Sequence, residues 1–320
     1  MVGDISRFRR RTLPGAPAHR RVLAAAAFAI LLGTLLPGPI DGQIARDPRP
    51  LRSGIDMVLV TATVLDAEGQ LVTGLPPEAF EIYEDGILQT IAQFTHERVP
   101  IGLGMLVDVS DSMFGQRILD ARRTVERFLL ELLNEDDTFF VMAFNHAPRL
   151  MTRWTNDPDV VRRALDELRP TGGTAIYDAL LQSIPVVRQR TRQRAAIVVI
   201  SDGADTASDA SISDVRTALL RSDAFVYAIA IDSPKTQAIN TRVNPIALGE
   251  ITNQSGGHTV VVRDAEEMAA ATARIAEELN SQYVLGYSSP KATDRKYHSI
   301  RVKIRGEGYR VRARNGYVGG

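Results

Sequence analysis

Five short, oxygen-bearing side chains stand at positions where the ends of buried strands could bring them to one metal ion. They are Asp108, Ser110, Ser112, Thr174 and Asp202. The first three follow the apolar run 101–107, the last follows the apolar run 195–200, and Thr174 immediately precedes a predicted helix. Apolar strands of this kind belong to parallel sheets, which bind ligands at the carboxyl ends of their strands. We therefore expect the five side chains to meet at one edge of a sheet.

The chemistry of this set indicates a divalent cation. Carboxylate and hydroxyl oxygens are hard donors, which suit Mg²⁺, Mn²⁺ or Ca²⁺ and do not suit soft metals. The sequence therefore predicts a metal site that recognises a partner.

Each candidate ligand also has a purely structural explanation. The two serines could cap a helix that begins near Gln116, Thr174 could cap the helix at Ala175, and Asp202 could stand in a turn. All three explanations would have to hold together at strand ends and in this order, so we favour the metal site. We interpret Asp111, which lies between ligand positions, as a solvated surface residue.

Alternating strands and helices between residues 100 and 280 would position these side chains. Apolar residues at helical spacing predict helices over 117–133, 157–168, 175–188, 213–221, 245–254 and 265–280. Apolar, β-branched runs predict strands over 101–107, 138–144, 195–200, 224–231 and 258–262. Such alternation is typical of an α/β, Rossmann-like fold with a doubly wound, mainly parallel sheet.

The segments on either side of this region are rich in strand patterns. On the N-terminal side these cover 56–65, 80–84 and 87–94, with a hairpin turn at Asp85-Gly86; on the C-terminal side they cover 282–287, 297–304 and 309–314. Neither set is large enough to bury a core alone. We predict that they pair into one small β-sandwich with the α/β domain inserted between its halves; two separate β extensions are the alternative. The basic residues of 301–314 fit the outward face of a hairpin better than a contact with an anionic glycan or lipid.

The bulk composition narrows the class of protein. The chain has 320 residues, 44% hydrophobic and 24% charged content and a formal net charge of zero, which is ordinary for a globular protein and does not indicate nucleic-acid binding. Cysteine is absent, so neither disulfides nor thiol chemistry can contribute.

The N-terminal segment predicts export. A basic stretch ending at Arg20-Arg21 precedes the apolar run 22–36, which has the length of a signal sequence and is short for a membrane span. We expect residues 1–42 to be a signal peptide or an uncleaved anchor, and 43–54 to be a linker. We then expect an N-terminal β segment (55–98), the α/β domain (99–281) and a C-terminal β segment (282–320). The body would be periplasmic or extracellular, touching the membrane only if the N-terminal segment is retained.

Together, the strand leading to Asp108-x-Ser110-x-Ser112, the loop Gly172-Gly173-Thr174 and the segment Ser201-Asp202-Gly203 resemble a von Willebrand factor type A domain over residues 100–280. In that family the five positions form a metal-ion-dependent adhesion site, and all five match here. The resemblance implies Mg²⁺ (or Mn²⁺ or Ca²⁺), with some contacts through water. The ion is then under-neutralised and open to a carboxylate from a protein partner. Family analogy makes the helix 265–280 the element that would move.

A closer resemblance concerns the flanking segments. Tyr83–Gly86, Phe94–His96 and Ser281–Tyr287 are similar to a group of exported bacterial proteins described as von Willebrand factor A-related and abundant in acidobacteria. This resemblance implies location and architecture but assigns no partner.

Enzymatic alternatives lack the residues that they need. A haloacid dehalogenase-type phosphatase requires a second aspartate two positions after the first, where this chain has Ser110, which cannot shuttle a proton near neutral pH. Neither a Gly-x-Ser-x-Gly motif nor a phosphate-binding loop occurs. We therefore expect a non-enzymatic binding protein that acts in adhesion or envelope assembly; a metal-indifferent structural protein is the alternative, followed by a hydrolase.

Overall fold

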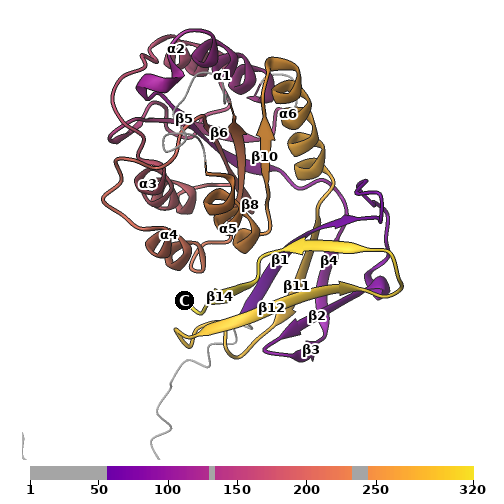
Figure 1. The fold of residues 1–320 in the computed structure, drawn as a ribbon. Coiled ribbons are helices and arrows are strands. Elements are labelled where there is room, and N and C mark those ends of the chain that lie inside the picture. The colour runs from indigo at the N-terminus through magenta and orange to yellow at the C-terminus, as the bar shows by residue number, and fades with distance from the viewer. Residues whose placement is uncertain (1–55, 130–133, 233–243) are drawn as a thin grey trace, which may run out of the picture. The chain divides into compact units, whose positions relative to one another are not determined.

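The computed structural model describes residues 56–129, 134–232 and 244–320 (Figure 1). The expected signal or anchor and the expected linker lie outside the described residues, as does the end of the predicted helix 117–133. Within the described ranges, none of the helices combines the length and apolarity that crossing a membrane requires. The boundaries expected at residues 98, 99, 281 and 282 stay predictions.

A six-stranded sheet forms the centre of the α/β region. In spatial order its strands are β10 (Thr259–Val262), β9 (Phe225–Ile231), β8 (Arg194–Ser201), β5 (Ile101–Asp108), β6 (Thr138–Phe144) and β7 (Pro148–Leu150). All neighbours are parallel except β7, which runs antiparallel to β6. β5, β8 and β9 are buried along their whole lengths, as their apolar runs predict.

Helices cover both faces of this sheet (Figure 1). One core contains side chains of α1 (Gln116–Arg127), α2 (Pro158–Asp166) and α6 (Ala265–Asn280), and the other contains those of α3 (Ile176–Arg188), α4 (Ile212–Leu219) and α5 (Pro245–Ser255). α5 runs one residue beyond its predicted end at residue 254, and it is followed by Gly256, whose φ of +95° is the left-handed conformation that glycine adopts most easily. The predicted fold class, with its doubly wound and mainly parallel sheet, is confirmed.

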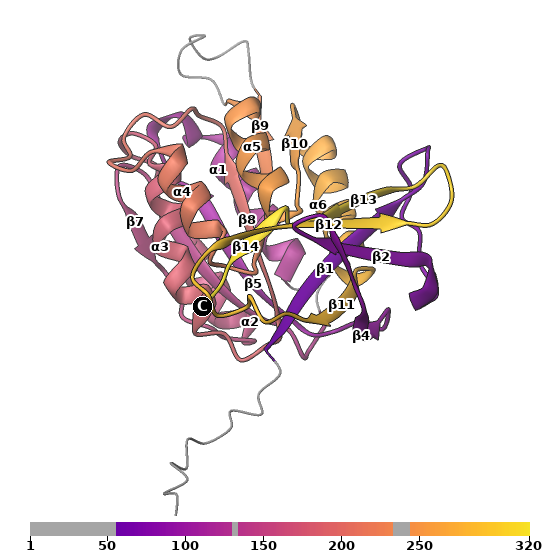
Figure 2. The same ribbon diagram turned by 90° about the horizontal axis from the view of Figure 1, so that it is seen from below.

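Strands from the two ends of the described chain form two further antiparallel sheets (Figure 2). One has the order β13 (Arg310–Ala313), β1 (Met57–Leu65), β11 (Tyr283–Ser288), β4 (Ile91–Thr95). The other has the order β14 (Gly316–Val318), β12 (Tyr297–Ile304), β2 (Phe80–Glu84), β3 (Ile87–Gln89). Apolar side chains of both sheets share one buried cluster, so the expected β-sandwich forms from both flanks, and the alternative of two separate extensions is wrong.

The prediction of one continuous strand over 87–94 is also wrong. β3 pairs with β2 and β4 pairs with β11, so the chain changes sheets at Thr90. A strand that crosses from one sheet of a sandwich to the other forms a corner of the sandwich. Local alternation cannot reveal such a corner, because both halves keep a strand conformation.

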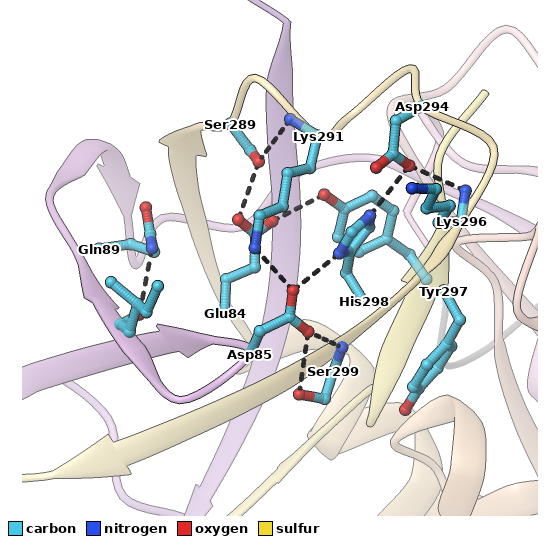
Figure 3. A network of polar contacts seen from close by, with 12 residues as sticks. Glu84, Asp85, Gln89, Ser289, Lys291, Asp294, Lys296, Tyr297, His298 and Ser299 are labelled. Atoms are coloured by element: carbon cyan, nitrogen blue, oxygen red, sulfur yellow. Dashed lines mark hydrogen bonds and ion pairs between the residues drawn. The ribbon is translucent and has the colours of Figure 1, made fainter.

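The predicted hairpin turn lies at the centre of a polar network that ties the two flanks together (Figure 3). Asp85 and Gly86 have φ values of +49° and +81°. The Asp85 carboxylate accepts hydrogen bonds from Lys291 Nζ at 2.7 Å and from the Ser299 backbone N–H at 2.9 Å, and it contacts His298 Nδ1 at 2.8 Å. The hairpin of the N-terminal segment is therefore held by charged groups of the C-terminal segment.

Asp85→Asn is expected to lower the free energy of unfolding by about 1–2 kcal/mol near pH 6, because charged hydrogen bonds become neutral ones. Asn tolerates the left-handed conformation, so the loss reports charge and not backbone strain. Hydrogen bonds from Lys291 and His298 hold the pKa of Asp85 well below its usual range. Burial opposes charging of His298, but hydrogen bonds with Asp294 and Asp85 prevail and raise its pKa.

These directions fix the pH window for that measurement. The contribution of Asp85 is complete above its unfolded-state pKa of 3.8 and is lost as the pH falls below it. The contribution of His298 is complete below 6.5 and is lost as the pH rises through its higher folded-state pKa. Urea unfolding should therefore show the largest difference between wild type and Asp85→Asn at pH 5–6; a difference that stays constant from pH 3 to pH 9 would contradict this. Asp66→Asn is the matched control, since that carboxylate accepts from the Gln70 backbone N–H in another turn of the sandwich.

Candidate metal centre at the ends of the parallel strands

Asp108 ends β5 and is fully buried. Its Oδ1 accepts a hydrogen bond from the Ser110 backbone N–H at 2.8 Å, and its Oδ2 accepts one from Ser201 Oγ at 2.5 Å. Burial raises the pKa of Asp108 to about 7, against these hydrogen bonds and with some help from the nearby negative charge of Asp202. A carboxylate in this environment lacks a compensating positive charge.

Hydrogen bonds continue from Asp108 to the other strand end. Ser110 Oγ lies 3.0 Å from Ser112 Oγ, and Ser112 Oγ donates to Asp202 Oδ1 at 2.6 Å. Asp202 directly follows β8, the parallel neighbour of β5. Four of the five predicted ligands are thus joined in one hydrogen-bonded chain across two adjacent strand ends.

Thr174 belongs to the loop that packs against the first of these segments. The Thr171 N–H donates to Val109 O at 2.8 Å, and the Asp111 N–H donates to Gly172 O at 2.9 Å. Thr174 itself is buried, and its carbonyl accepts from the Thr206 and Ala207 backbone N–H groups. Among the described residues, no hydrogen bond joins its side chain to the other four candidates, so the loop is adjacent but Thr174 is not part of the chain.

The capping explanations for these residues are wrong. α1 begins after Gly115 and α3 begins after Ala175, and neither N-terminus has a side-chain cap from its own N-cap residue. At α3 the cap comes from a different loop, because Asp205 Oδ1 accepts from the Ile176 and Tyr177 backbone N–H groups at 2.8 and 3.3 Å. The side chains of Ser110, Ser112 and Thr174 therefore cap neither α1 nor α3.

Arg117, which was not recognised in the sequence as part of the site, holds the carboxylate of Asp202. Arg117 Nη1 lies 2.8 Å from Asp202 Oδ2 and donates to the Ser112 carbonyl at 2.6 Å. Burial raises the pKa of Asp202, although the Ser112 hydrogen bond and the Arg117 charge oppose this effect. The one available signal was an arginine in the first turn of a helix, where the macrodipole disfavours a cation.

The residues present fit a hard divalent cation. The buried carboxylates of Asp108 and Asp202 and the hydroxyls of Ser110 and Ser112 already converge. The Asp108 carboxylate lacks a compensating positive charge. Within the described residues no cluster of three or more His, Cys, Asp or Glu could bind a metal, so a site here would depend on hydroxyl donors in addition to Asp108 and Asp202. An ion held this way would keep Lewis acidity for an outside ligand.

The surface beside these residues is suited to contact with another molecule. Phe114 follows Ser112 by two positions and is 79% exposed, while its neighbour Met113 is fully buried. A cleft of about 550 Å³ lies beside Val109 and Thr171, and its charged lining residues are Arg149, Arg169 and Glu167, which leaves it with a net positive charge. An exposed aromatic ring and two cations therefore lie close to the hydrogen-bonded chain.

Comparison with known proteins now identifies the domain. Residues 103–204, which contain all five candidate ligands, match the family model of the von Willebrand factor type A domain. The chain contains a type A domain. A solved von Willebrand factor type A structure from Catenulispora acidiphila covers 82% of this chain and 73% of its own length at 13% identity, with a TM-score of 0.50, which supports the fold alone.

Two relatives match part of this chain by sequence. Mouse inter-alpha-trypsin inhibitor heavy chain H2 is 27% identical over 154 residues, and an uncharacterized Synechocystis protein is 29% identical over 115 residues. These alignments span 42% and 35% of this chain but only 16% and 27% of the relatives. The relatives' activities therefore do not transfer to the whole chain.

Proposed function

We propose that this chain is an exported, non-enzymatic binding protein whose type A domain recognises an acidic group on a protein partner through a divalent cation, in adhesion or envelope assembly. The observation that supports it best is the hydrogen-bonded chain from Asp108 through Ser110 and Ser112 to Asp202. It gathers hard oxygen donors at the binding edge of a parallel sheet, with a carboxylate that lacks a counter-charge.

Each neighbouring feature has a role in this proposal. Mg²⁺, Mn²⁺ or Ca²⁺ would be held by Asp108, Ser110, Ser112, Thr174 and Asp202, and when bound it would supply a strong electrostatic attraction for a partner's carboxylate. Arg149 and Arg169 would attract acidic surfaces to this edge, and the exposed Phe114 would contribute apolar contact. The basic and apolar pattern of residues 1–42 supports export, to the periplasm or the cell exterior.

The proposal is tested by capture from an envelope extract. Immobilised wild-type protein should retain a partner in Mg²⁺ and release it in EDTA, and Asp202→Ala should retain none. Phe114→Ala should weaken retention about tenfold while leaving Mg²⁺ uptake unchanged, because the ring is exposed and its loss leaves the donors in place. Leu150→Ala, at a second exposed apolar residue on β7, is the matched control.

Other outcomes would replace this function with one of its alternatives. Complexes that form equally in EDTA and with Asp202→Ala would indicate a metal-indifferent structural protein. Hydrolytic turnover that Asp108→Ala abolishes would indicate an enzyme.

Arg117→Gln is expected to raise Mg²⁺ affinity about fivefold, since a neutral side chain no longer competes with the cation for Asp202 (roughly 1 kcal/mol). The melting temperature in EDTA should fall, because the buried Asp202 loses its positive partner, and the rise on adding Mg²⁺ should be larger than in wild type. Calorimetric titration and thermal melts measure both effects.

Arg123→Gln serves as the control for that prediction. Arg123 lies on the same helix and pairs with Asp120 at 3.1 Å, with its side chain 70% exposed. This variant loses the same charge and should change neither quantity. Equal Mg²⁺ affinities for Arg117→Gln and wild type would mean that Arg117 only supports the fold.

A further inference from the structure

A second candidate binding region lies in the β-sandwich, between β12 and β13. It is a cleft of about 520 Å³ lined by residues 299–303 of β12 and by Val311 and residues 313–315 of β13 and its continuation, together with Tyr83 and Gly86. β12 and β13 belong to different sheets, and no ladder joins them in the described part of the chain. The cleft therefore lies where the sandwich opens between the edges of its two sheets.

The edge of β12 that faces this cleft has no partner strand beyond Ser299. β12 pairs with β14 only over residues 297–299, whereas it pairs with β2 over 300–304. The Arg305 N–H donates toward β2, to Ala79 O, and the Ile300 N–H donates to Asn315 O on the opposite side. Backbone groups alternate between the two edges of an antiparallel strand, so residues 302 and 304 direct theirs away from β2, as Ile300 does.

β13 presents a second open edge to the same cleft. It pairs with β1 alone among the described strands. Val64 O of β1 accepts from the Val72 N–H, so Val64 faces away from β13, and the hydrogen-bonded pairs between the two strands are those of Arg310 and Arg312. Val311 and Ala313, which line the cleft, therefore direct their backbone groups away from β1. Open edges of this kind are sites for adding a strand.

The charge around the cleft is positive. Arg301, Lys303 and Arg314 line it, and no carboxylate is among the lining residues. The nearby Glu81 is already engaged, by Arg305 Nε at 3.1 Å and by the Tyr83 hydroxyl at 2.7 Å. Arg314 Nη2 donates to Leu59 O at 2.8 Å, while its buried Nε has no hydrogen-bond partner in the described part of the chain.

We propose that this cleft binds an extended, acidic peptide segment of a partner protein, which adds to the open edge of β12 as a further strand. Backbone hydrogen bonds from residues 302 and 304 would hold the peptide, and its carboxylates would meet the exposed Arg301 and Lys303. Such a contact is separate from the type A metal centre and does not require it.

Charge argues against two other occupants of the cleft, the chain's own segment 43–54 and a second copy of the protein. Residues 43–54 contain Arg46, Arg49 and Arg52 against a single Asp47, and their two prolines lack N–H donors. A second copy placed symmetrically on this edge would bring the same cations against one another, which is destabilising. An acidic segment of another protein is the occupant that complements both the backbone and the charge.

Fluorescence anisotropy of the full-length protein in EDTA tests this proposal without the metal centre. The probe is a labelled peptide of about ten residues in which Glu alternates with Thr and Val, and micromolar binding that weakens with salt is expected. The double variant Arg301→Glu with Lys303→Glu should lose at least about tenfold in affinity. Its melting temperature should fall slightly, because Lys303→Glu places a second carboxylate opposite Glu81 on β2, so circular dichroism checks that the variant is folded at the temperature of the assay. Arg123→Glu with Arg153→Glu, the same charge change on exposed residues of the type A domain, should bind as wild type does.

Backbone methylation separates strand addition from simple charge attraction. Two versions of the peptide carry N-methyl groups on alternate residues, in opposite registers, so that each blocks one edge of the added strand. The version whose methyl groups lie on the edge that pairs with β12 should fail to bind, and the version methylated on the other edge should bind.

Four results would overturn the proposal. Equal binding of both methylated peptides would mean charge attraction alone, and absence of peptide binding would mean an ordinary solvated surface. Self-association in sedimentation that the double glutamate variant abolishes would assign the edge to a second copy. Binding of phosphatidylglycerol vesicles, lost in the same variant and without peptide binding, would assign it to a membrane surface. Loss of metal binding in a separate titration would contradict the proposed type A function and leave this inference untouched.

Discussion

Asp108→Asn is expected to weaken Mg²⁺ binding more than about a hundredfold, to below detection in calorimetric titration. Exchange of residues that merely support a metal ligand costs about 10–100-fold in affinity, and a direct carboxylate donor should cost more. Asp108 is fully buried and hydrogen-bonded on both oxygens, so no other carboxylate can move into its place without breaking those bonds. Wild-type protein that takes up no Mg²⁺ or Mn²⁺ would end the metal hypothesis.

The same variant should not lose stability in EDTA at pH 8. Because burial raises the folded-state pKa of Asp108 from 3.8 to about 7, the folded protein binds more protons than the unfolded chain between these values. The metal-free wild type therefore loses stability as the pH rises through that window, by a few kcal/mol at most, whereas the neutral Asn does not. In EDTA, the melting temperature of the wild type relative to that of Asp108→Asn should be lower at pH 8 than at pH 5.

Asp111→Asn provides the matched control for both measurements. It removes the same charge three positions later, from an exposed side chain. Mg²⁺ affinity should stay within about threefold of wild type, and the stability difference should not depend on pH in that window. An equal loss of affinity in the two variants would mean that general negative charge, and not a ligand at Asp108, attracts the cation.

Much of the fold could be predicted because its signals are local. The fully buried strands β5 and β8 are continuous apolar runs, and the turn at Asp85-Gly86 needs two positive φ values that this pair adopts readily. The split of 87–94 between two sheets could not be predicted in this way. The first half, β3, pairs locally with β2, but the second half, β4, pairs with the distant strand β11, and the pairing of the three-residue strand β14 with β12 is also long-range.

The candidate site shows the same division. Residue types at strand ends indicated the carboxylates and hydroxyls, since parallel neighbours bring their carboxyl ends together. Ser201, Arg117 and Asp205 were missed because their roles are set by side-chain directions across loops. Ser201 binds the second oxygen of Asp108, and Asp205 caps a helix from another loop. Protonation, too, follows from burial and partners, which no linear motif records.

Glu278→Leu is expected to destabilise the protein by about 3–5 kcal/mol, the usual cost of leaving a buried ionic partner unpaired. Glu278 lies on α6 and is 1% exposed. Its Oε1 accepts from Thr63 of β1 at 3.2 Å and from the Tyr227 hydroxyl of β9 at 3.0 Å, and its Oε2 accepts from Arg312 of β13 at 2.5 Å. One carboxylate thus joins the type A domain to strands from both flanks of the chain.

Two probes show how far that connection makes the protein unfold as one unit. Trp154 is the only tryptophan and contacts Phe140 of β6, so its fluorescence reports the type A domain, whereas far-ultraviolet circular dichroism reports all regular structure. Their urea transitions should coincide in wild type and separate in Glu278→Leu, with fluorescence and dichroism giving different midpoints. Glu277→Leu, at the exposed neighbouring position, is the control and should change the free energy of unfolding from either probe by no more than about 0.5 kcal/mol.

A double variant decides whether the loss comes from the unpaired charge or from the packing of α6. Replacing Arg312 by Leu in the Glu278→Leu background removes the orphaned guanidinium, and apolar replacement of both partners in a buried pair is often neutral or stabilising. We therefore expect Glu278→Leu with Arg312→Leu to recover at least half of the lost stability and to bring the two transitions together again. If the double variant is as unstable as the sum of the single ones, the carboxylate is not what couples the flanking strands to the type A domain, and the other contacts of α6 must do so.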